Sequence, residues 1–125
     1  MAYRVSTSQF AQLVERALSE VPAQFAAALE EVPVEIRERA TPQQRRKVGL
    51  GDRGLLLGLY QGAPLTHRSV EAPGISPVIY IFQQDIELAS NSEADLVRRV
   101  RTTVLHEVGH HFGLGEEDLR RLGYG

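Results

Sequence analysis

The sequence predicts a protein of mixed helix and strand, on three observations. A one-sided apolar stripe follows Ser6, the run Val78–Phe82 is β-branched or aromatic throughout, and a long helical pattern follows Ser92. The chain has 125 residues, enough to bury a sizeable core and within the range of one domain. We therefore expect residues 1–125 to form a single domain.

Two helices are indicated near the N-terminus. Ser6 and Gln9 have the spacing of a capping box, which predicts a helix that begins after Ser6. The apolar residues that follow recur on one helical face, and they are Phe10, Leu13, Val14, Ala17, Leu18 and Val21. Pro22 is expected to end or kink this helix, or to open a second one over residues 25–32.

The middle of the chain has the patterns of strands and loops. Residues 32–37 alternate between apolar and other side chains, which predicts a short strand, at an edge because it contains a proline. Residues 38–54 are polar and turn-prone, so a loop is expected there. Leu55–Tyr60 is a compact apolar segment typical of a strand, and Val78–Phe82 is the clearest strand of the chain.

The C-terminal third predicts a long helix. Ser92 is a suitable N-cap for a helix that runs to about Phe112, where the glycines of residues 113–115 would end it. A short final helix is expected to begin near Glu116.

The long helix carries the one motif with specific chemistry, HExxH at His106–His110. Residues four apart project about 40° apart on a helix, so both imidazoles can bind one metal ion. Neutral imidazole is a zinc ligand, and Glu107 is placed to take a proton from water at that ion. The helix has an aliphatic stripe roughly opposite the histidines, and it consists of Val97, Val100, Val104 and Val108. The alternative interpretation is a pair of surface or hydrogen-bonded histidines on an amphipathic helix.

A catalytic zinc site needs a third protein ligand. Glu116, six residues after His110, is the best-placed candidate if the chain folds back at the glycines. Glu117 and Asp118 are the alternatives, and all three acids also suit the first turn of a helix without any metal. His67 lies in a loop-like stretch and is expected to be exposed.

Composition excludes several other kinds of site. There is no cysteine, which excludes disulfides, thiolate zinc fingers and cysteine nucleophiles. The net charge is −2 and the short arginine runs lie among acids, so we expect no nucleic-acid or membrane partner. The N-terminus lacks the apolar stretch of a secretory signal, which makes a cytoplasmic location the expectation.

These residues resemble a known class of enzymes. His106, Glu107, His110, Gly113 and Glu116 are similar to the metzincin motif with its last histidine replaced by an acid. The stretch HEVGHHFGLGEEDL, with the segment Gly58–Gly62 upstream, more closely resembles a small bacterial family of minimal zincin-like metallopeptidases. The resemblance implies an α+β fold with a small mixed β-sheet, a backing N-terminal helix and an active-site helix.

The resemblance also implies hydrolysis of peptide bonds with one Zn²⁺ and Glu107 as general base. If Val78–Phe82 lies at the sheet edge, Tyr80 and Ile81 are the candidate residues for binding an extended peptide or protein substrate, and Tyr80 or Tyr60 for stabilising the oxyanion. A second hypothesis remains open, namely a metal-binding or partner-binding module that hydrolyses nothing. It is favoured by the small size and by the lack of a methionine turn, since the only methionine is Met1.

Overall fold

The computed structural model describes residues 2–51, 53–62, 76–111 and 116–121. The helices and strands occur in the order α1 (Thr7–Ser19), α2 (Ala23–Glu31), β1 (Val34–Arg37), α3 (Pro42–Lys47), β2 (Gly58–Gln61), β3 (Val78–Phe82), α4 (Gln83–Ala89), α5 (Glu93–His111) and α6 (Glu116–Arg121). None of the helices in these ranges is both long and apolar enough to cross a bilayer.

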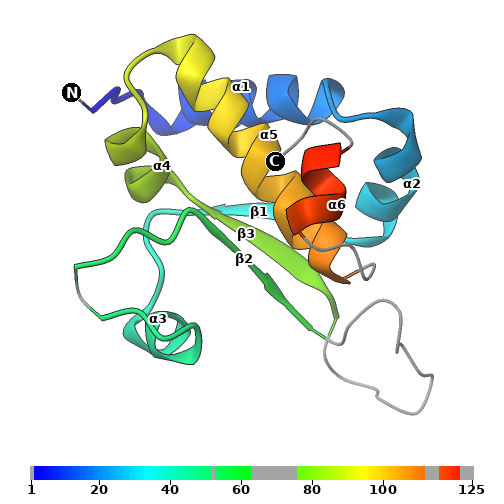
Figure 1. The fold of residues 1–125 in the computed structure, drawn as a ribbon. Coiled ribbons are helices and arrows are strands. Elements are labelled where there is room, and N and C mark those ends of the chain that lie inside the picture. The colour runs from blue at the N-terminus through cyan, green and yellow to red at the C-terminus, as the bar shows by residue number, and fades with distance from the viewer. Residues whose placement is uncertain (1, 52, 63–75, 112–115, 122–125) are drawn as a thin grey trace.

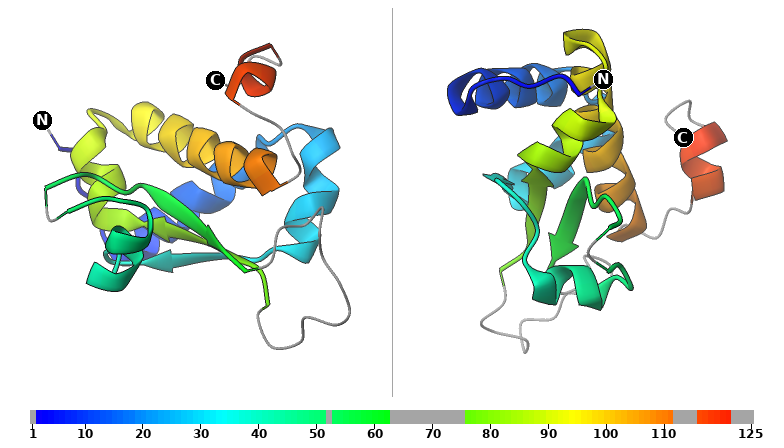
Figure 2. Two further views of the ribbon diagram at one scale, coloured as in Figure 1. Left: turned by 60° about the horizontal axis from the view of Figure 1, so that its bottom comes forward. Right: turned by 90° about the vertical axis from the view of Figure 1, so that its left-hand side faces the viewer.

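The strands form one mixed sheet in the order β1-β3-β2. β1 pairs with β3 in parallel, Val34 opposite Ile79, and β2 pairs with β3 antiparallel, Tyr60 opposite Ile79. Helices α1 and α5 pack together on one side of the sheet, and α3 lies on the other side (Figures 1 and 2). The predicted α+β fold, with a small mixed sheet, a backing N-terminal helix and a second long helix, is confirmed.

The core lies between the sheet and the two long helices. Its fully buried side chains include Phe10 of α1, Ile79 and Ile81 of β3, and Val100 and Val104 of α5. The aliphatic stripe predicted for α5 is confirmed, because all four of its valines are buried. α5 is therefore fixed in rotation by its own apolar side, which determines where its polar side faces.

The helix starts follow the predicted capping signals. The Ser6 hydroxyl accepts a hydrogen bond from the N–H of Gln9 at 3.1 Å, and the Gln9 side chain accepts one from the N–H of Ser6. The Ser92 hydroxyl accepts one from the N–H of Asp95, also at 3.1 Å, and α5 begins at the next residue after this serine. Pro22 occupies the N-cap of α2, so it opens a second helix rather than kinking the first.

The middle of the chain departs from the prediction in three ways. Residues 38–54 contain the helix α3, which the loop prediction missed although Thr41 and Gln44 form a capping box at its start. A second helix, α4, follows β3 directly and was not predicted. The strand predicted from Leu55 begins only at Gly58.

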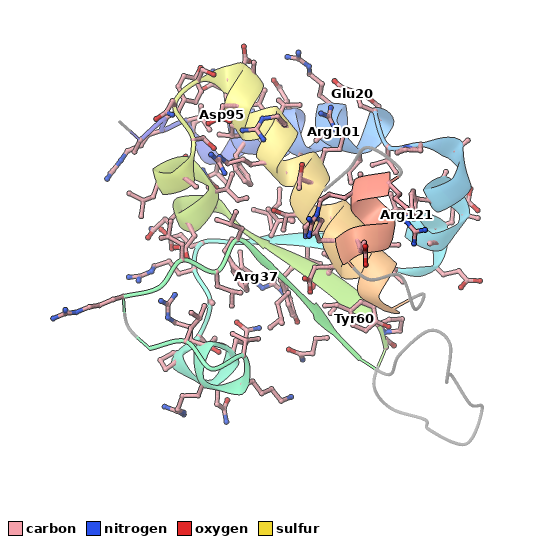
Figure 3. The ribbon with its side chains drawn as sticks, viewed as in Figure 1. Glu20, Arg37, Tyr60, Asp95, Arg101 and Arg121 are labelled. Carbon is pink, nitrogen blue, oxygen red and sulfur yellow. The ribbon has the colours of Figure 1, made fainter. Side chains whose placement is uncertain are left out.

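The arginines of α5 are paired with acids. Arg101 contacts Glu20 at the end of α1, with 2.6 Å between Nη1 and Oε2, and the two lie side by side in Figure 3. Arg98 and Arg99 bind the carboxylate of Asp95 one turn earlier in α5. These pairs give the arginine run a structural role on a solvated helix face.

Asp95 contributes a pH-dependent share of the stability. The main-chain N–H of Asn91 donates to its carboxylate at 3.0 Å, and with Arg98 and Arg99 it holds the pKa of Asp95 below its ordinary value of 3.8, although desolvation opposes the shift. A lowered pKa in the folded state stabilises the protein above the unfolded pKa, and this contribution is lost as the pH falls through the folded pKa.

We therefore expect Asp95→Asn to lower the free energy of unfolding at pH 7 by about 0.5–1 kcal/mol. The difference from wild type should shrink as the pH falls below about 3.8, the unfolded value. Thermal unfolding at several pH values measures it, with Glu93→Gln in the same helical turn as the control. A difference that stays constant from pH 7 to pH 3 would contradict the assignment.

Candidate metal centre

The HExxH motif occupies the C-terminal turns of α5. Four helical residues rise about 6 Å, so His106 and His110 follow one another along the same side of the helix. The His106 side chain is half-buried, and its Nε2 atom is buried. The His110 backbone belongs to α5, whereas its side chain lies outside the described part of the structure.

Glu107 is held against the sheet. Its Oε1 accepts a hydrogen bond from the main-chain N–H of Tyr60 in β2 at 2.7 Å, and its side chain is half-buried. Tyr60 lies below the C-terminal half of α5 in Figure 3. A carboxylate that accepts from a main-chain N–H has a fixed direction, because that donor is part of a strand.

β2 is an edge strand, and Tyr60 donates from its outer edge. The N–H of Phe82 donates to the carbonyl of Leu57 at 3.0 Å, so residues 57, 59 and 61 direct their main-chain groups toward β3. By the alternation of an antiparallel pair, Gly58 and Tyr60 direct theirs away from β3. The Glu107 carboxylate thus lies at the outer edge of β2, to which no other strand of the described ranges is paired.

Val78–Phe82 does not meet the condition set for peptide binding, because β3 is the central strand and both of its edges are paired. Ile81 is fully buried in the core. Tyr80 points to the other face of the sheet, away from α5, where the Arg37 guanidinium lies 5.2 Å from its ring centroid. The structure therefore separates Tyr80 and Ile81 from Glu107, and the main-chain edge near Glu107 belongs to β2.

The sequence suggested the Tyr60 side chain as a group that stabilises the oxyanion, but Tyr60 contacts Glu107 through its main chain. Its side chain is 6% exposed and belongs to the core, so what it presents to Glu107 is its main-chain N–H. Every residue except proline has this group, and no residue pattern could have identified it. The only available signal was the segment Gly58–Gly62, which the sequence singled out without assigning it a function.

The candidates for the third ligand lie at the start of α6. Glu116 begins α6, which contacts α5, and Glu117 is exposed, while the side chains of Glu116 and Asp118 lie outside the described residues. Among the side chains that are described, no three His, Cys, Asp or Glu residues gather in a metal-binding group. The ligand set His106, His110 and Glu116 stays a prediction.

The donor chemistry fits zinc. Imidazole and carboxylate are both ligands that Zn²⁺ accepts, and the four-residue spacing places His106 and His110 on one side of α5. No competing thiolate exists, because the chain has no cysteine.

A helix with HExxH lying under the edge strand of a small mixed sheet defines the zincin class of fold and site. A family model described as zincin-like metallopeptidase matches residues 29–125, and the chain belongs to this family.

A solved structure shows the same fold. The chain is similar to a conserved hypothetical protein from Thermus thermophilus, with 25% identity and a TM-score of 0.57. The match covers 86% of this chain and 94% of the other. Comparison with curated proteins found no match.

Proposed function

We propose that this chain is a zinc-dependent peptidase that binds one Zn²⁺ through His106, His110 and Glu116 and uses Glu107 as general base. The observation that carries the proposal is the position of Glu107. Glu107 follows the half-buried His106 in α5. Its carboxylate is fixed at the outer edge of β2 by the 2.7 Å hydrogen bond from the N–H of Tyr60. Family membership supports the same chemistry.

When bound, Zn²⁺ would supply Lewis acidity, which polarises a peptide carbonyl and lowers the pKa of water. The protein side chains do the rest. Oε1 of Glu107 is occupied by the N–H of Tyr60, so we assign proton transfer to Oε2. This oxygen takes the proton of the attacking water and returns it to the leaving amine.

The substrate in this proposal is an extended peptide that adds to the sheet along β2. The main-chain groups of Gly58 face outward from β2, and strands with such groups at a sheet edge bind peptides by main-chain hydrogen bonds. The outward N–H of Tyr60 is already held by Glu107. A peptide in that position lies beside the Glu107 carboxylate. Binding through main-chain groups gives broad specificity, with side-chain preference left to the surrounding surface.

The first test is metal content. After reconstitution and desalting, wild-type protein is expected to hold about one equivalent of zinc by elemental analysis, and His106→Ala and His110→Ala to lose at least about 100-fold in zinc affinity. His67→Ala is the control, because it removes a histidine outside α5. Wild-type protein with less than about a tenth of an equivalent would contradict the proposal.

A further inference from the structure

The segment Gly58–Gly62 carries two glycines whose surroundings exclude a side chain. A Cβ atom added to Gly58 would lie 2.5 Å from Cγ2 of Thr103 in α5 and 2.9 Å from the carbonyl oxygen of Tyr80. Gly62 has a φ of +135°, and a Cβ there would lie 2.8 Å from Cα of Pro77. β2 is therefore closely packed at both ends, against α5 and β3 at Gly58 and against Pro77 at Gly62.

The contact of Gly58 with α5 lies one helical turn before Glu107. Thr103 and Glu107 are four residues apart, so they lie on the same side of α5. On β2, Gly58 and Tyr60 are two residues apart and direct their main-chain groups to the same edge. Two contacts in register thus join strand and helix, one at Gly58 and Thr103 and the other between Tyr60 N–H and Glu107.

We propose that Gly58 is a positioning residue for Glu107. Because it has no side chain, β2 approaches Thr103 closely enough for the Tyr60 N–H to hold Oε1 of Glu107, which leaves Oε2 directed at the substrate. The role in catalysis rests on the proposed peptidase function. The contact itself belongs to the protein without metal or peptide.

The test is amide hydrogen exchange by NMR on the metal-free protein. In wild type, the Tyr60 amide is expected to be protected although it faces the open edge of the sheet. Glu107→Ala should raise its exchange rate at least about tenfold, and Gly58→Ala should do the same. The amides of Leu59 and Gln61, which face β3, should keep their protection in both variants.

Two further variants make the test specific. Thr103→Ser removes the methyl group nearest to the added Cβ, so the Gly58→Ala/Thr103→Ser double variant should recover part of the Tyr60 protection. Gly51→Ala is the matched control, because a Cβ at Gly51 meets no atom within 4 Å. If Gly58→Ala does not fold, Glu107→Ala still decides whether the contact exists.

The proposal is overturned by any of three results. The first is a Tyr60 exchange rate that Glu107→Ala leaves unchanged. The second is a Gly58→Ala variant in which Leu59, Tyr60 and Gln61 lose protection together, which would mean that the glycine is merely structural. The third is a Gly58→Ala variant whose Tyr60 amide stays as protected as in wild type, which would mean that the added side chain does not disturb the contact with Glu107.

Activity separates this inference from the proposed function. In the zinc-loaded protein, Gly58→Ala is expected to lower kcat on a peptide mixture by about 10- to 100-fold with zinc stoichiometry unchanged. If wild-type protein cleaves no peptide but the exchange results hold, the peptidase proposal fails and the positioning contact stands. If wild type cleaves and Gly58→Ala cleaves equally well, the positioning role fails alone.

Discussion

Replacing Glu107 by glutamine is expected to lower the rate of peptide cleavage by about 10²- to 10⁴-fold while zinc remains bound. Glutamine has nearly the same shape and keeps an oxygen that can accept the hydrogen bond from the Tyr60 N–H, which lies 2.7 Å from Oε1 of the native carboxylate. It cannot take up a proton from water. The variant therefore removes the general base and retains the contact between α5 and β2.

The measurement is cleavage of a broad peptide mixture by mass spectrometry, together with zinc content. Glu93→Gln is the matched control, because Glu93 is an exposed acid at the start of the same helix. Comparison with Glu107→Ala separates the two roles of the side chain, since alanine loses both the base and the acceptor of the Tyr60 N–H. Glu107→Gln protein that cleaves as fast as wild type would exclude Glu107 as the base.

The same experiment decides between the two hypotheses that the sequence left open. A metal-binding or partner-binding module would hold zinc through the histidines of α5 and show no cleavage in wild type or in any variant. Cleavage that depends on Glu107 favours the enzyme. The family match supports metallopeptidase chemistry in general, and the residues of this chain have to be tested individually.

The helices of the core were predictable because their signals are local. A capping box at Ser6 and a cap at Ser92 set the starts of α1 and α5, and each helix carries its own apolar stripe. The rotation of α5 followed from the same stripe, since burial of the valines determines which side His106 and Glu107 occupy. The HExxH motif and the helix that carries it could therefore both be predicted from the sequence.

The arrangement of the sheet was not predictable in the same way. Strand order depends on which strands pair after the chain has folded. The residues of β3 carry no local signal that both of its edges are paired. A continuous apolar strand such as Val78–Phe82 is in fact typical of the buried centre of a sheet. Because β3 is central, the edge strand beside Glu107 is β2, which has only four residues.

The two missed helices were short and polar. α3 has six residues, and its capping box at Thr41 and Gln44 lies in a stretch whose other side chains are mostly charged or amide. One of those charged residues, Arg45, belongs to a basic run at residues 45–47, although its side chain is only 7% exposed. Its partner Asp85 lies on α4, far away in the sequence, so the pair gave no local signal.

That buried ion pair holds the segment that leads into β2. Nη1 of Arg45 lies 3.6 Å from Oδ2 of Asp85, and the Arg45 guanidinium also donates to the carbonyls of Gly51 and Gly54. Oδ2 of Asp85 accepts a hydrogen bond from the N–H of Leu56 at 2.8 Å. Leu56 is two residues before Gly58, so the pair fixes the chain at the point where it enters the edge strand beside Glu107.

Breaking the pair from one side is expected to lower the free energy of unfolding by about 3–5 kcal/mol, because the remaining charge stays buried without its opposite charge. Asp85→Ala and Arg45→Met should each show this loss in urea-induced unfolding, and Arg46→Ala, an exposed neighbour in α3, is the control. The double variant Arg45→Met/Asp85→Leu should lose less than either single variant, since it leaves no unpaired charge. Single variants that cost no more than Arg46→Ala would mean that the pair does not fix the entry to β2, and the edge strand would then depend on its contacts with β3 and α5 alone.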